Sequence, residues 1–434
     1  MLRRGSKYLK KCTFLLQTQN RSFLTNEYKC EAAWSEQKSS PVLRNVNLND
    51  FYTTLSQNFT SKGVISAIDV DVFANAVRDP AYLEELKDLL FKLRLSAETG
   101  NTLESTYHAT VRNYIEFGNI QDLIHILKNP LNYGIFLDDI TANILLDKLV
   151  TSNNYELAAN VAGLIMLQEE FSNEITCALS QYACYKYLTA LSGVPLEETP
   201  KQEEKKKIEE IKIRVKFIRN FYYDDHFDIK DLPTLSGKTL AWISKRNKEN
   251  VNDNLQIIGW LHYKKYDKLL TLCEDLNKSK SFKVYEEVLK LIEKHMESCE
   301  KETLEKCSSL LKLCPKTELV LEDSIKNLIE DAINKIQKRD ISTYQMLFQT
   351  WEKKREEKLK EQLQRLKRVQ RIAEIEEKQK ELKVEEQKLW FFENEDKIDL
   401  EIENKQKLEN EVKTSSKDKS DENYIPPEIL PKRK

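Results

Sequence analysis

The sequence has few glycines and prolines, the residues that interrupt helices, and it lacks the long apolar runs that cross membranes. Only 9 of its 434 residues are glycine and 10 are proline, and neither residue occurs between Pro315 and Pro426. Strands joined by tight turns usually need more of both, so the composition gives no indication of strands and favours helices. The longest clean apolar run, Val161 to Leu167, is far shorter than the roughly 20 residues that span a bilayer, so no membrane span is expected.

Neither sign of charge dominates the chain as a whole. Lysine and arginine number 69, and aspartate and glutamate number 71, which gives a formal net charge of −2. A protein that held nucleic acid by its overall charge would be strongly basic. Any binding to nucleic acid must therefore use local patches.

Acidic side chains are absent before Glu27. The residues that precede it carry six basic side chains and five serines or threonines, a composition typical of a mitochondrial transit peptide. Arg21-Ser22-Phe23 resembles the processing site of such leaders, which predicts a transit peptide over residues 1–23 with cleavage after Phe23. A retained basic arm that touches RNA or lipid is the alternative, and plastid targeting also remains open.

Three threonines, Thr106, Thr141 and Thr176, recur every 35 residues, and the apolar residues around the first two keep the same period. Within each unit the apolar residues form two helix-spaced groups, separated by Phe117-Gly118-Asn119 in one unit and by Ser152-Asn153-Asn154 in the next. Each unit is therefore predicted to be a helical hairpin that stacks on its neighbours. The predicted fold is all-α, with such a solenoid over residues 67–192.

The remainder of the chain is predicted to be helical without a readable period. Residues 24–66 form an N-terminal extension, and a charged linker over 193–207 leads to an irregular helical-repeat domain over 208–340. Asp231-Leu232-Pro233 and Ser236-Gly237 predict a break inside that domain. A long charged helix follows over 341–393, and the acidic residues 394–434 are predicted to be disordered.

Charge along the long helix is polarised. Lys353 to Arg371 holds nine lysines and arginines against three glutamates, whereas Glu374 to Glu411 holds fourteen acidic residues against seven basic ones. The basic half fits a phosphate backbone, and the residues predicted to contact RNA there are Lys353, Lys354, Arg355, Arg365, Lys367, Arg368 and Arg371. The alternative is a solvated single helix with internal ion pairs.

The segment Gly134 to Asn143 reads Gly-Ile-Phe-Leu-Asp-Asp-Ile-Thr-Ala-Asn and resembles the junction between two pentatricopeptide repeats. Together with the leader, the aromatic segment Thr343 to Trp351 and the charged helix after it, this stretch also resembles the family of small-subunit protein twenty-seven of the mitochondrial ribosome. The resemblance covers about Glu27 to Lys388. It implies a structural subunit in the mitochondrial matrix that binds small-subunit ribosomal RNA and neighbouring ribosomal proteins.

Pentatricopeptide repeats read one base per repeat, with a residue near the start of the first helix and another at the end of the repeat. Carried onto this sequence, those pairs are His108 with Asp138 and Asn143 with Asn173. His108 departs from the residue types that the family uses, and two or three readable units are too few to specify a sequence. Contacts by shape and phosphate are therefore expected rather than coded readout. Whether transfer or messenger RNA is also bound stays open.

No residue pattern predicts catalysis, a bound metal or a cofactor. No serine or cysteine has a readable base partner, and Cys299, Cys307 and Cys314 have the spacing of buried residues on one helical face rather than that of zinc ligands. Two alternatives to a ribosomal protein remain. A free pentatricopeptide RNA-binding factor, acting on the processing, stability or translation of mitochondrial transcripts, would leave the small subunit in moderate salt. An enzyme or a pure protein scaffold would show no RNA crosslinks.

Overall fold

The computed structural model describes residues 22–193, 229–279, 282–298 and 302–417. The chain divides into two compact units, residues 1–355 and 356–434. The transit peptide predicted over 1–23 and the linker predicted over 193–207 lie almost entirely outside the described residues.

The described residues are almost entirely helical, which confirms the all-α prediction. The first unit begins with η1 (Asn26–Lys29), α1 (Glu31–Lys38), α2 (Pro41–Arg44), α3 (Leu48–Lys62), α4 (Ala67–Ala76), η2 (Pro80–Tyr82), α5 (Leu83–Leu95) and η3 (Ala97–Asn101). The central helices are α6 (Glu104–Phe117), α7 (Ile120–Lys128), α8 (Pro130–Tyr133), α9 (Asp139–Thr151), α10 (Tyr155–Leu167) and α11 (Glu174–Gly193). After them come α12 (Leu232–Ser244), α13 (Asn250–His262), α14 (Tyr266–Lys278), β1 (Val284–Tyr285), α15 (Glu286–Ser298), α16 (Glu302–Leu313), β2 (Lys316–Thr317), α17 (Leu321–Glu393) and α18 (Glu395–Lys417).

The two short strands pair in parallel, with Val284 opposite Lys316. Within the described ranges, no helix is both long enough and apolar enough to cross a bilayer.

The predicted repeats are helical hairpins, α6 with α7 and α9 with α10, and α11 packs against both helices of the second hairpin. Asn119 begins the second helix of its hairpin as an N-cap, because its side chain accepts a hydrogen bond from the Gln121 amide at 3.0 Å. Thr106, Thr141 and Thr176 are each the third residue of their helix and are at most 2% exposed. The period of 35 residues therefore marks one buried position at the start of each repeat.

The break predicted between Asp231 and Gly237 is wrong, because Asp231 is the N-cap of α12, which begins at Leu232 and continues through Gly237. Proline is tolerated in the first turn, where its missing N–H has no helical partner. A Cβ on Gly237 would lie 2.9 Å from the Gly259 carbonyl oxygen, and one on Gly259 would lie 2.5 Å from the Ala241 nitrogen. The two glycines let the backbones of α12 and α13 touch.

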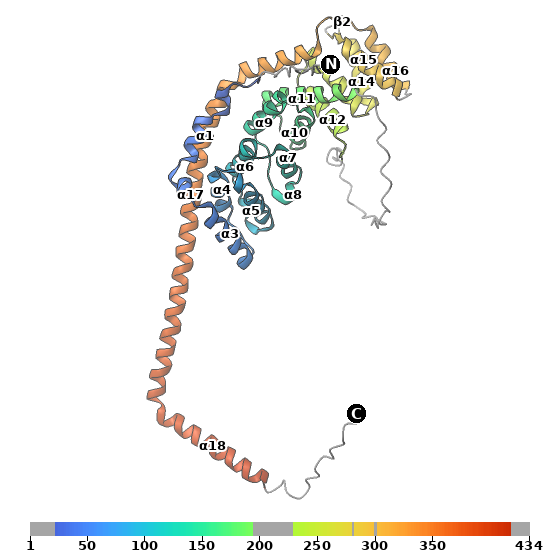
Figure 1. The fold of residues 1–434 in the computed structure, drawn as a ribbon. Coiled ribbons are helices and arrows are strands. Elements are labelled where there is room, and N and C mark those ends of the chain that lie inside the picture. Colours follow the sequence, from blue (N-terminus) through green and yellow to red (C-terminus); the bar gives the residue numbers. More distant parts are fainter. Residues whose placement is uncertain (1–21, 194–228, 280–281, 299–301, 418–434) are drawn as a thin grey trace, which may run out of the picture. The chain divides into compact units, whose positions relative to one another are not determined.

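The long helix predicted over 341–393 starts earlier, at Leu321, because neither glycine nor proline interrupts it. From Leu321 to Arg355 the buried side chains of α17 lie three or four residues apart, except for the adjacent Ala332 and Ile333, and form the face that packs in the first unit. There α17 meets the N-terminal segment, residues 24–66, as Figure 1 shows for α1. The ring centroids of Tyr28 and Tyr344 lie 5.7 Å apart. From Glu356 onward, no described side chain of α17 or α18 is buried.

Part of the acidic segment predicted to be disordered is helical, since α18 covers Glu395–Lys417. The prediction was wrong for these residues because it used only their charge and low apolar content. Glutamates four residues before lysines support the helix, with distances of 3.9 Å for both Glu403–Lys407 and Glu409–Lys413. Residues 418–434 lie outside the described part of the chain.

Candidate nucleic-acid interface

The asparagines predicted to read bases lie inside the protein. Asn143 is fully buried, and its Nδ2 donates a hydrogen bond to the Tyr28 hydroxyl at 2.7 Å. Asn173 caps α11 with its Oδ1 and donates from Nδ2 to Asp340 Oδ2 at 2.8 Å. The Tyr28 and Tyr344 hydroxyl oxygens lie 3.0 Å apart. These groups form one buried network, which joins the N-terminal segment, the repeats and α17.

The ionisation of the network follows from its burial. Burial raises the pKa of the Tyr28 and Tyr344 hydroxyls above the usual range, so both remain neutral donors. Asp139 lies at the start of α9, and burial raises its pKa to about 6, with further contributions from the nearby carboxylates of Glu170, Asp138 and Asp340. Asp139 is therefore the residue of this region that we expect to titrate near neutral pH.

His108 is held by a similar set of protein contacts. Its Nδ1 lies 2.8 Å from Asp138 Oδ2, and the rings of Trp34, Phe348 and Trp351 surround it at centroid distances of 5.1, 5.3 and 5.1 Å. Burial pushes the pKa of Asp138 upward, but His108 and the hydrogen bonds from Thr141 outweigh it and hold that pKa below the usual value. Asp138 also caps α9.

Asn143 and His108, which the resemblance to pentatricopeptide repeats predicts to contact bases, are thus in contact with tyrosine and tryptophan side chains. They come from the N-terminal segment and from α17, which lie far from the repeats in sequence. A base would pair with Asn143, Asn173 or His108 only if these two elements moved away. The sequence analysis did not identify Tyr28 and Asp340. The helical spacing of Tyr344, Phe348 and Trp351 was the available signal that this face of α17 is buried.

Arg355, predicted to contact phosphate, is instead part of the core. It is 1% exposed, and its Nε lies 2.7 Å from Asp71 Oδ2. The same carboxylate accepts hydrogen bonds from Ser105 at 2.5 Å and Thr106 at 2.9 Å. Arg355 lies on the buried face of α17, four residues after Trp351. The prediction that it contacts phosphate is therefore wrong, and Arg355 instead connects α17 to α4 and α6 through Asp71.

The other predicted phosphate contacts are exposed side chains of α17. Lys353 and Lys354 belong to the first unit, and Arg365, Lys367, Arg368 and Arg371 belong to the second. We call these last four residues the basic patch. Within the described part of the chain, none of the four forms an ion pair, whereas Lys358 and Lys360 pair with Glu361 and Glu356 at 3.0 and 3.7 Å. The basic patch is therefore free to meet an anion.

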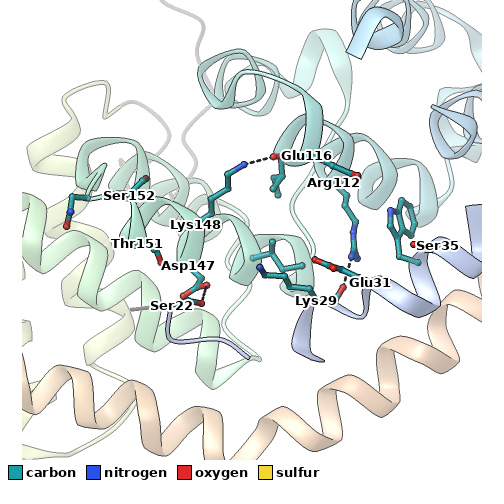
Figure 2. Close-up of a pocket in the computed structure, with 14 residues that line it drawn as sticks. Ser22, Lys29, Glu31, Ser35, Arg112, Glu116, Asp147, Lys148, Thr151 and Ser152 are labelled. Carbon is teal, nitrogen blue, oxygen red and sulfur yellow. Dashed lines mark hydrogen bonds between the residues drawn. The ribbon is translucent and has the colours of Figure 1, made fainter. Parts of the chain in front are cut away.

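A cavity of about 970 Å³ opens between α1, α6 and α9 (Figure 2). Arg112 donates to the Lys29 carbonyl oxygen and Lys148 to the Ile115 carbonyl oxygen, each at 2.5 Å. Asp147, also on the wall, accepts hydrogen bonds from Ser22 and Phe23. Cations and carboxylates alternate around this cavity, so its charge does not favour phosphate.

Cys299, Cys307 and Cys314 were predicted to be buried on one helical face. Cys307 and Cys314 are buried, and Cys299 lies outside the described residues. Among the residues that the structure describes, no three histidine, cysteine, aspartate or glutamate side chains are placed to hold a metal ion.

A family model described as mitochondrial 28S ribosomal protein S27 matches residues 1–381. The match includes the repeats, the irregular helical domain and the basic patch, and it ends before the aromatic residues at the end of α17. A ribosomal protein family implies a structural role. The chain therefore belongs to the mitochondrial 28S ribosomal protein S27 family and is a small-subunit protein of the ribosome in the mitochondrial matrix.

Proposed function

We propose that the chain binds small-subunit ribosomal RNA through phosphate contacts of the basic patch. The observation that carries this proposal is the presence of four exposed basic side chains, free of ion pairs in the described structure, within seven residues of α17. Each cation that neutralises a phosphate releases counterions, so such contacts give affinity without reading sequence. This kind of contact suits a fixed place in an assembly.

The helical repeats then act as a scaffold rather than as a reader of bases. Asn143, Asn173 and His108 already bind Tyr28, Asp340 and Asp138. Breaking these buried contacts would cost free energy before any base was bound. This disfavours a free pentatricopeptide factor that acts on mitochondrial transcripts, and no observation favours transfer or messenger RNA as a partner.

Neighbouring ribosomal proteins are the second class of partner in this proposal. Trp390, Phe391 and Phe392 are 58, 44 and 69% exposed and lie in the acidic half of the charged helices. Exposed aromatic clusters commonly mark protein interfaces. The surrounding negative charge complements a basic segment, so we propose that a basic segment of a neighbouring ribosomal protein covers them.

Ultraviolet crosslinking of intact small subunits tests the RNA contact. Digestion after glutamate gives a peptide from Gln362 to Glu374 that contains the whole basic patch. We expect crosslinked nucleotides on this peptide and none on the peptides from Ile375 to Glu393, which serve as the control from the same helix. Crosslinks confined to peptides that carry His108 or Asn143 would contradict the proposal and favour base reading.

Sedimentation separates the proposal from the free-factor alternative. In moderate salt a ribosomal component stays in the small-subunit peak of a sucrose gradient, whereas a free factor moves to the light fractions. Release of the chain at salt concentrations that leave other small-subunit proteins in place would contradict a structural role.

A further inference from the structure

The carboxylate of Asp147 is buried in α9 without a cation. It is 4% exposed and accepts hydrogen bonds from the Ser22 hydroxyl at 2.7 Å and from the Phe23 and Leu24 amides at 2.9 and 3.4 Å. All three donors are neutral. Within the described ranges, no lysine, arginine or histidine pairs with Asp147.

Two of the three basic side chains on the cavity wall, Arg112 and Lys148, are engaged elsewhere, and the third, Lys29, forms no ion pair with Asp147 among the described residues. Lys148 donates to the Ile115 carbonyl oxygen and Arg112 to the Lys29 carbonyl oxygen (Figure 2). A buried carboxylate is costly unless a cation or several hydrogen bonds compensate it. Hydrogen bonds from a charged donor are roughly twice as strong as those from a neutral one. The site around Asp147 therefore suits a positively charged donor.

The three donors lie on both sides of the predicted processing site. Ser22 and Phe23 are the last residues of the leader, and Leu24 is the first residue after it. The Leu24 side chain is itself 4% exposed, so core packing holds this residue in place whether or not the leader is attached. The nitrogen of Leu24 would then remain beside Asp147 after cleavage.

We propose that Asp147 is the binding site for the α-ammonium group of Leu24 in the processed protein. An endopeptidase breaks the Phe23–Leu24 peptide bond with one water molecule. Phe23 leaves with a new carboxylate, and the Leu24 nitrogen becomes an amine that takes up a proton. Loss of Ser22 and Phe23 removes the donor to Asp147 Oδ2 and one of the two donors to Oδ1, and leaves the Leu24 nitrogen, the new cation, beside Oδ1. Processing thereby supplies the counter-ion that the buried carboxylate lacks.

The order of events follows from the same contacts. The Phe23 ring packs edge-on against Tyr182 at 5.7 Å, next to the buried Leu24. A protease needs an accessible, extended segment. Cleavage therefore precedes the docking of Leu24 on α9.

The first test identifies the terminus of the protein in purified mitochondrial small subunits. Free amines are labelled before digestion, and the labelled terminal peptide is sequenced by mass spectrometry. We expect it to begin at Leu24. A chain that begins at or before Phe23, or after Leu24, overturns the proposal.

The second test measures the role of the charge. Recombinant protein that begins at Leu24 is compared with the same protein acetylated at its terminus and with one that carries an added glycine. We expect both changes to lower Tm by about 1–2 °C. Asp147→Asn should abolish the difference, whereas Asp122→Asn, an exposed control on α7, should retain it.

Identical melting of the free and acetylated proteins would overturn the proposal. This comparison keeps Asp147 intact, so it remains decisive even where Asp147→Asn fails to fold. The proposal is independent of the RNA contacts of α17, because neither test involves RNA.

Discussion

Asn143 shows how one buried amide connects parts of the chain that are distant in sequence. Its Nδ2 donates to the Tyr28 hydroxyl, which lies 3.0 Å from that of Tyr344. The Asn143 Oδ1 has no hydrogen-bond partner among the described atoms. The side chain therefore contributes chiefly through its single donor to Tyr28.

We expect Asn143→Ala to reduce the free energy of unfolding by about 1–3 kcal/mol, because a buried hydroxyl loses its donor. Urea denaturation followed by circular dichroism measures this change. Tyr28→Phe should cost less when made in the Asn143→Ala background, since the two groups share one hydrogen bond. The exposed control Asn132→Ala should have little effect. Equal stabilities of Asn143→Ala and wild type would contradict the network.

Asp139 predicts a pH dependence of stability. Its pKa is about 6 in the folded protein and roughly 3.9 in an unfolded chain, so the folded state holds the proton more tightly. Stability from this group is complete below about pH 4 and is lost as the pH rises through 6. Asp139→Asn should stabilise the protein by about 1–2 kcal/mol above pH 7 and have little effect at pH 4. The urea midpoints of Asp139→Asn and wild type, compared from pH 4 to above pH 7, measure this difference in stability. A stabilisation by Asp139→Asn that does not change with pH would contradict a raised pKa of Asp139.

At the scale of elements, the size of the side chains at a helix–helix contact sets how closely the two helices pack. The α12–α13 contact depends on the absence of side chains at Gly237 and Gly259, whereas the hairpins of the repeats pack through larger apolar residues such as Leu146. Close backbone contact leaves no space for adjustment, so small volume changes there have large effects.

We expect Gly259→Ala to lower the free energy of unfolding by about 3 kcal/mol or more, because its Cβ would lie 2.5 Å from the Ala241 nitrogen. Gly100→Ala is the matched control, since nothing lies within 4 Å of the Cβ it would add. Thermal unfolding of both variants gives the comparison. A Gly259→Ala variant as stable as the control would show that α12 and α13 separate easily.

The hairpins of the repeats could be predicted from the sequence because burying one face of each helix leaves a periodic apolar pattern. Gly237 was misread because a glycine inside a helix resembles a break until the helix that contacts it is known. The buried network was not predictable, since Tyr28 and Asp340 are 312 residues apart and only the fold brings them together. Arg355 was misassigned for the same reason: the sequence shows its charge but not its contact with Asp71.

At the scale of the whole molecule, we assign different roles to the two units. The first unit has a core in which the repeats, the N-terminal segment and the start of α17 are joined by buried polar contacts. The second unit consists of charged, exposed helix, and the basic patch belongs to it. The central claim is that the first unit is a scaffold and the basic patch provides the phosphate contacts.

Competitive incorporation into the small subunit tests this claim most directly. Tagged wild type is expressed together with a variant in which Arg365, Lys367, Arg368 and Arg371 are replaced by glutamate, and their ratio in the small-subunit peak is measured. A matched control reverses the four exposed lysines of the acidic half, Lys378, Lys380, Lys383 and Lys388, and so makes the same change in net charge.

We expect the basic-patch variant to be incorporated about tenfold less than wild type or worse, because lost phosphate contacts remove counterion release. The lysine control and Asn143→Ala should stay within about threefold of wild type, because neither the lysines of the acidic half nor the buried Asn143 is proposed to contact RNA. Equal incorporation of the basic-patch variant, or a larger loss from Asn143→Ala than from the four charge reversals, would contradict this claim.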